Sequence, residues 1–142
     1  MASIREQIIL AVLAKLQALQ TLPATSIFRS RQTAITREES PCAVLRKLVE
    51  PAPENRNVDE RRLEFAVEIY TRGDDAEAAA DPIEVEIHAV LMADRTLGGS
   101  CTLLLAVDTI FEGADADQPA HRTEMHFSAL YRVDSNDLSK PA

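Results

Sequence analysis

The strict alternation of apolar and polar side chains over residues 62–71 constrains the fold of this chain most strongly. Side chains point to opposite faces of a strand in turn, so this pattern predicts a strand with one buried and one wet or partner-covered face. Residues 123–133 show the same alternation. The residues predicted to face the core are Leu63, Phe65, Val67 and Ile69 in the first segment and Met125, Phe127, Ala129, Tyr131 and Val133 in the second.

Two segments have the spacing of amphipathic helices. The first covers residues 4–19, where Ser3 and Glu6 form a predicted capping box and Pro23 follows the end. The second is predicted to begin at Asp81, because Asp is a good N-cap, Pro82 suits the first helical position and Glu84 completes a box. Residues 76–80 are rich in alanine and would add at most a turn before it.

Further strands are predicted at residues 27–30, 42–49 and 102–111, which gives the order α-β-β-β-α-β-β. An antiparallel-rich mixed sheet of about four to five strands, with both helices packed on one face, satisfies all the apolar stripes. We therefore predict one α+β domain over residues 1–133. Residues 50–61 are expected to form a long mobile loop and residues 134–142 a flexible tail.

The composition makes tight nucleic-acid binding unlikely. Fifteen Lys and Arg oppose 23 Asp and Glu, for a net charge of −8, and only 4% of residues are aromatic. A surface that grips phosphates requires a positive field, and one that stacks bases requires aromatic side chains. Cys42 and Cys101 match no metal-binding spacing and are expected to be reduced, buried thiols in a cytoplasmic protein. No apolar run is long enough to cross a bilayer, and the N-terminal residues do not resemble a signal peptide.

The residues that could act in catalysis or bind a metal are better explained by structural or surface roles. No nucleophile motif accompanies a histidine, and Gly98-Gly99-Ser100 lacks the lysine of a phosphate-binding loop. We therefore expect no enzymatic activity, no cofactor and no metal. The residues considered were His88, expected on the second helix, His121, expected in a loop, His126 and Glu124, expected on the polar side of the last strand, and the nearby Asp115 and Asp117.

A series of segments over residues 3–133 has a recognisable order and spacing. It consists of the first helix, Ile27-Phe28-Arg29-Ser30-Arg31 with residues 34–39, the strand at 63–70, Arg72-Gly73-Asp74, residues 79–94, Leu97-Gly98-Gly99 and residues 127–132. In this order and spacing the chain resembles the tail terminator, or tail-completion, proteins of long-tailed bacteriophages and prophages, the minor tail protein U group. None of the motifs is catalytic.

The resemblance implies a structural role in virion assembly. Members of this family form a ring, commonly a hexamer, that caps the tail tube, ends its polymerisation and presents a surface to the head-tail connector protein. DNA passes through the ring without specific binding. Six copies at −8 each would carry −48, and such a ring would repel the DNA backbone. The implied location is the bacterial host cytoplasm during assembly and then the virion tail.

Closed rings use heterologous contacts, in which one patch of a subunit meets a different patch of its neighbour. The sequence-based hypothesis for these patches pairs arginines near the first strand with the turn at residues 72–77; ordinary surface charges are an equally open interpretation. The interface residues predicted in this way are Arg29, Arg31, Arg37, Arg72, Asp74 and Asp75.

Other functions stay open on the sequence. The chain could be another neck or tail-tube structural protein of a phage, and a member that polymerises without limit would form tubes. It could be a small-molecule-binding or enzymatic α+β domain, with a pocket between helices and sheet that uses His88 or His126. It could also be a dimeric bacterial domain unrelated to phage.

Overall fold

The computed structural model describes residues 1–51, 59–114 and 119–142, so most of the expected loop at 50–61, and Asp115 and Asp117, lie outside the described residues. The elements in chain order are α1 (Ile4–Gln17), η1 (Ala24–Ser26), β1 (Ile27–Arg29), η2 (Arg37–Glu39), β2 (Cys42–Val49), β3 (Glu60–Arg72), α2 (Ala76–Met92), β4 (Leu103–Ala114) and β5 (Ala120–Arg132).

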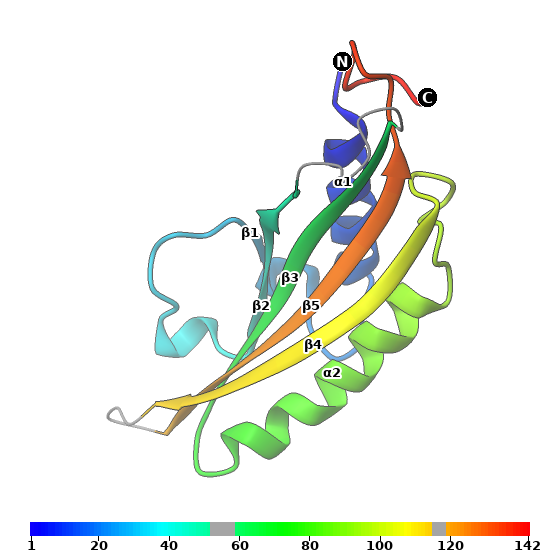
Figure 1. Cartoon of the computed structure of the whole chain (residues 1–142). Helices are drawn as coiled ribbons and strands as arrows, with labels where there is room; N and C mark the ends of the chain where they lie inside the picture. Colours follow the sequence, from blue (N-terminus) through cyan, green and yellow to red (C-terminus); the bar gives the residue numbers. More distant parts are fainter. Residues whose placement is uncertain (52–58, 115–118) are drawn as a thin grey trace.

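The five strands form one mixed sheet in the order β1-β2-β3-β5-β4 (Figure 1). Only the short β1 runs parallel to its neighbour β2; the other three pairings are antiparallel. The predicted α+β class and the predicted order of elements are confirmed. The strands β3 and β5, which carry the clearest alternation, lie together near the middle of the sheet and pair from Glu60↔Arg132 to Arg72↔Ala120.

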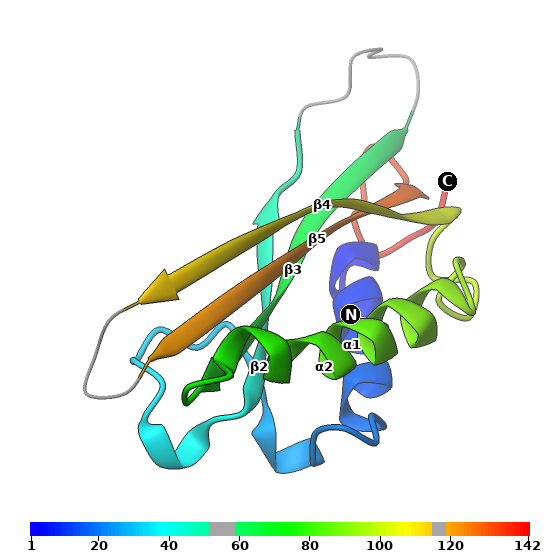
Figure 2. The ribbon, with the colours of Figure 1, turned by 90° about the horizontal axis from the view of Figure 1, so that it is seen from below.

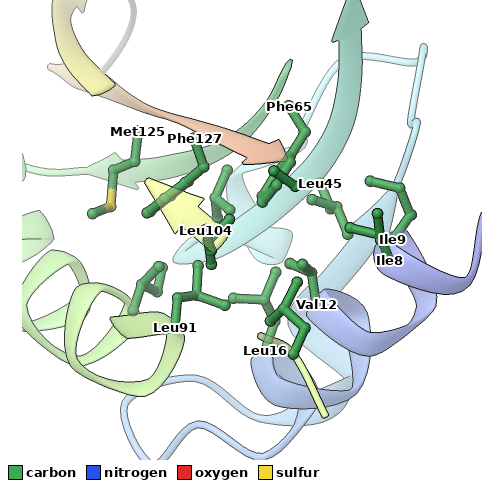
Figure 3. Close-up of a cluster of buried hydrophobic side chains, with 14 of the residues drawn as sticks. Ile8, Ile9, Val12, Leu16, Leu45, Phe65, Leu91, Leu104, Met125 and Phe127 are labelled. Carbon is green, nitrogen blue, oxygen red and sulfur yellow. The ribbon is translucent and has the colours of Figure 1, made fainter. Parts of the chain in front are cut away.

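Both helices cover the same face of the sheet (Figure 2). The predicted inward side chains of β3 and β5 are buried there, and they pack against the apolar stripes of α1 and α2 in one core. Figure 3 shows Ile8, Val12 and Leu16 of α1 meeting side chains of the sheet such as Leu45 and Leu104. We call this the inner face, and we call the opposite face, which neither helix covers, the open face.

The start of α1 is held by its own cap and by the C-terminal segment. The Ser3 hydroxyl accepts a hydrogen bond from the Glu6 backbone N–H at 3.1 Å, as predicted, whereas the Glu6 carboxylate turns away to Arg29. The Ile4 N–H, which has no partner within the helix, donates to the Leu138 carbonyl at 2.8 Å. Residues 134–142, expected to be a flexible tail, thus fold back over the N-terminus of α1.

The predicted start of α2 is wrong. The helix begins at Ala76 with Asp75 as its N-cap residue, and Pro82 lies inside it. Pro82 is an interior residue of this helix, so its ring removes one intrahelical hydrogen bond and crowds the carbonyl of Ala78. The alanines at 76, 78, 79 and 80 favour helix and offset part of that cost. Ala76 and Ala80 are buried on the same stripe as Ile83 and Ile87, so packing on the sheet stabilises this extra turn.

The last hairpin is longer than predicted. The strand β4 reaches Ala114 and β5 begins at Ala120, so His121 lies on a strand rather than in a loop. Its side chain is buried and stacks on Phe111, with ring centroids 6.2 Å apart. Local sequence did not reveal this because the pairing of residues 111–114 with 120–123 extends the ladder into polar residues. In the described part of the chain, no helix is both long and apolar enough to span a membrane.

The packing of α1 on the sheet predicts a sharp contrast between two leucines of the same helix. Leu16 is fully buried in the core, whereas Leu10 is 47% exposed. We expect Leu16→Ala to lower the free energy of unfolding by about 2–5 kcal/mol, because it removes buried methyl groups and leaves a cavity. Leu10→Ala removes the same atoms from the solvent side, and we expect a change within about 0.5 kcal/mol. Urea denaturation followed by circular dichroism measures both, and equal losses would contradict this packing.

Candidate functional site

The open face carries a ladder of charged and polar side chains across four strands. The strand register places Arg46, Ala66 and His126 in one row, Glu68, Glu124 and Ile110 in the next, and Tyr70, Arg122 and Glu112 in a third. Residues directly opposite each other on neighbouring strands project from the same face. The polar half of the alternation in β3 and β5 therefore forms one continuous surface.

The centre of this surface is the carboxylate of Glu68, which is only 6% exposed. It accepts a hydrogen bond from Arg46 Nε at 2.6 Å and another from the Tyr70 hydroxyl at 3.1 Å. Arg122 Nη1 lies 4.0 Å from its other oxygen. Burial, and then the negative charge of Glu68, raises the pKa of Tyr70, so this phenol stays a hydrogen-bond donor.

The neighbouring charges extend the network toward β4. Arg122 Nη2 lies 3.0 Å from Glu124 and also pairs with Glu112 on β4. The ring of His126 lies between two acids, with Nδ1 3.0 Å from Asp108 and Nε2 3.1 Å from Glu124. Acids and bases alternate on this face, so many of its charges are paired within the chain.

Beside the network lies a cavity of about 420 Å³ between the open face and residues 32–35. Its walls include Arg46, Tyr70 and Arg122 from the network. Arg72, at the end of β3, donates to the Ile35 carbonyl at 3.0 Å and so ties this loop to the sheet. In the described part of the chain, no group of three or more His, Cys, Asp or Glu side chains is arranged to hold a metal ion.

The structure pairs two of the predicted interface arginines within the chain. Arg29 on β1 forms a two-pronged contact with Glu6 of α1, with Nη2 2.6 Å from Oε1, and this contact lowers the pKa of the Glu6 carboxyl. Arg31 pairs in the same way with Glu39, at 2.7 Å, and its guanidinium lies 4.7 Å above the ring of Phe28. Sequence alone could not reveal the partner of Arg29, because α1 and β1 are brought together only by the fold.

The other predicted residues lie at one end of the sheet. Arg37 begins the short helix η2, and Arg72 contacts the loop at Ile35. Asp74 and Asp75 are exposed in the turn before α2, and the structure gives neither Arg29 nor Arg31 an ion pair with them. Arg29→Glu would therefore bring a carboxylate against Glu6, and lost self-association in that variant would not by itself identify an interface.

The two histidines considered for a binding pocket lie on opposite sides of the sheet. His88 is exposed on α2, which covers the inner face, whereas His126 belongs to the open-face network. Neither side chain therefore lies between the helices and the sheet. Sequence reasoning named His126 and Glu124 but missed Arg46, Glu68, Tyr70 and Arg122 of the network. The signal that could have found most of them is the polar half of the alternation in β3 and β5.

Comparison with known proteins informs the fold alone. No protein-family model matches the chain, and no curated protein matches it. A solved structure with 12% sequence identity covers 92% of this chain, and the match covers 96% of that structure's own chain, with a TM-score of 0.54. The chain therefore has a fold already seen over nearly its whole length.

The Arg31–Glu39 pair predicts a depressed carboxyl pKa. The Arg31 guanidinium, with help from the Thr36 backbone N–H, lowers the pKa of Glu39 from 4.5 to about 2. Because the folded pKa is depressed, the pair contributes stability above pH 4.5, and this contribution is lost as pH falls through about 2. Carboxyl-carbon NMR titration should give this low value, and Arg31→Gln should return it most of the way to 4.5. A Glu39 pKa near 4.5 in the unsubstituted chain would contradict the pair.

The cysteines predict a simple test of accessibility. Both thiols are free and buried, and burial raises the pKa of each to about 11. Thiolates are the reactive species, so we expect no reaction with a dithiobisnitrobenzoate reagent at about pH 8 in the folded protein. After denaturation in guanidinium both thiols should react. Rapid labelling of the folded chain would show that Cys42 or Cys101 lies in an exposed region.

Proposed function

We propose that this chain is the subunit of a phage or prophage tail terminator. In this role, copies assemble into a ring, most simply a hexamer, that caps the tail tube, ends its polymerisation and binds the head-tail connector protein. The role is structural and involves neither catalysis nor a cofactor. Assembly takes place in the host cytoplasm, and the ring then stays in the virion tail.

The proposal rests mainly on the order of helices and strands, which matches the order that the resemblance implies, and on the open face and free strand edges of the sheet. The resemblance implies an α+β subunit with the order found here, and both helices lie on one face of the sheet. This leaves the open face and the strand edges available to other proteins. Small domains with open edges frequently complete themselves by assembly.

The distribution of charge supports passage of DNA without binding. The chain carries −8 overall, and Arg46 and Arg122 of the open face are each paired with acids. Paired arginines release few counterions when a phosphate backbone approaches, so they contribute little affinity for DNA. The same pairs offer a patterned surface to tube and connector proteins.

The cavity beside the open-face network favours a second candidate, a small-molecule-binding domain. Its volume of about 420 Å³ is within the range of ligand pockets, and Arg46, Tyr70 and Arg122 supply polar groups. Recovery of one bound small molecule from the purified protein, with saturable rebinding, would support this function in place of the structural one.

Tube assembly in vitro tests the proposed function. A major tail-tube protein from the same phage or prophage is polymerised with and without the purified chain, and tube lengths are measured by electron microscopy. We expect rings at tube ends and an arrest of growth that depends on the amount of chain added. The matched control adds the chain only after growth has stopped, which should cap ends without changing length.

Tubes that lengthen equally in both reactions, with no ring at their ends, would overturn the proposal. Incorporation of the chain along the whole tube, or tubes formed by the chain alone, would assign it to tube building instead.

A further inference from the structure

No strand pairs with the outer edge of β4 in the described part of the chain. The strand lies at one margin of the sheet, runs from Leu103 to Ala114 and contains neither Pro nor Lys (Figures 1 and 2). Unpaired N–H and C=O groups along such an edge are a template for pairing with another chain, and natural proteins usually cover or charge them. Three large apolar side chains are exposed along it: Val107 at 57%, Ile110 at 41% and Phe111 at 59%.

The loop that precedes β4 covers only the start of this edge. The Leu104 N–H, directed away from β5, donates to the Arg95 carbonyl at 2.7 Å. Residues 105–113 have no such backbone contact among the described hydrogen bonds, and residues 106–113 are all exposed. A bulge between Ala106 and Thr109 interrupts the register, so Thr109–Gly113 is the regular part of the free edge.

The opposite margin of the same sheet also has a free end. The short β1 pairs with β2 only at Ala43, Val44 and Leu45, and the rest of β2 extends beyond it. In this extension Leu48 is 47% exposed and Val49 is 51% exposed. One sheet thus has an exposed apolar edge at each margin, and the two edges belong to different strands.

The two edges carry charges of opposite sign, and each of these side chains also pairs within its own chain. The free part of β4 carries Asp108 and Glu112, whose side chains are 62% and 60% exposed. The extension of β2 carries Arg46 and Lys47, at 30% and 41%. Arg46 projects from the open face, as do Asp108 and Glu112, so a sheet continued from one copy to the next would bring basic and acidic side chains together.

We propose that the free edge of β4 in one copy binds the free end of β2 in a second copy, so that the sheet continues from subunit to subunit. This inference rests on the proposed ring and identifies the contact that builds it. The strand β4 runs from Leu103, beside Leu130, to Ala114, whereas β2 runs from Cys42, beside Tyr70, to Val49. The two strands therefore have opposite directions in the sheet, and the new pairing is antiparallel.

The proposed contact is heterologous, because it joins different surfaces of two identical chains, and repeated contacts of this kind close into a ring when the rotation permits. The free parts also lie toward opposite ends of the sheet, since Glu112 pairs with Arg122 whereas Val49 pairs with Glu64. Neighbouring copies are consequently displaced along the strands. Closed barrels of tilted strands require such a stagger.

Directed cross-linking tests the contact. Ile110→Cys and Val49→Cys replace exposed side chains on the open side of the two edges, so neither is expected to disturb the fold. The native cysteines are buried and should not react. With a short bis-maleimide, the double variant should give a ladder of covalent species that ends at the size of the ring. An equal mixture of the single variants should give dimers only, and each single variant alone should give none.

A matched control replaces Val85, which is 63% exposed on α2, by cysteine in combination with Val49→Cys. This pair should give no ladder. The mass of the unsubstituted chain, free and on tail tubes, is measured in parallel.

A ring without cross-links between positions 110 and 49 would overturn this inference and leave the proposed function standing. Dimers from Ile110→Cys alone would overturn it in favour of a twofold contact between β4 strands. A chain that stays monomeric both free and on tube ends would overturn the inference and the proposed function together.

Discussion

The burial of one face of the sheet under two helices is the constraint from which the rest of this structure follows. Leu63, Phe65, Val67 and Ile69 of β3 and their partners on β5 can leave water only if α1 and α2 lie on the same side. Because both helices pack on the inner face, neither is left to cover the open face. At the margins of the sheet, the short β1 pairs with only part of β2, and the loop at Arg95 contacts only the start of β4, at Leu104.

On the open face, Arg46, Glu68, Arg122 and Glu124 pair with one another. Glu68 is nearly buried, and its carboxylate is stabilised by hydrogen bonds from Arg46 and Tyr70. A buried carboxylate without such partners would be strongly destabilising. The network thereby stabilises buried charge on this face although neither helix packs over it.

Sequence predicted the parts of the fold that depend on local periodicity and missed those that depend on distant partners. Three confirmed features depend only on residues close together in the sequence. They are the alternation in β3, the Ser3 cap and the apolar stripe of α1. The predicted start of α2 at Asp81 was wrong, because the packing of Ala76 and Ala80 on the sheet stabilises helix before Pro82. For the candidate site, the pairing of Arg29 with Glu6 could not be predicted, since it joins residues brought together only by the sheet. The edges of β4 and β2 could be found only once the strand order was known.

A tail-terminator ring requires copies of this chain to join through heterologous contacts and to close into a ring. Native mass spectrometry over a concentration series, with the chain alone and bound to tail tubes, tests this most directly. The account predicts a single closed species, most simply a hexamer, that forms either free or at tube ends and does not grow further as concentration rises. A twofold dimer as the final state, or an open series of ever larger assemblies, would contradict it.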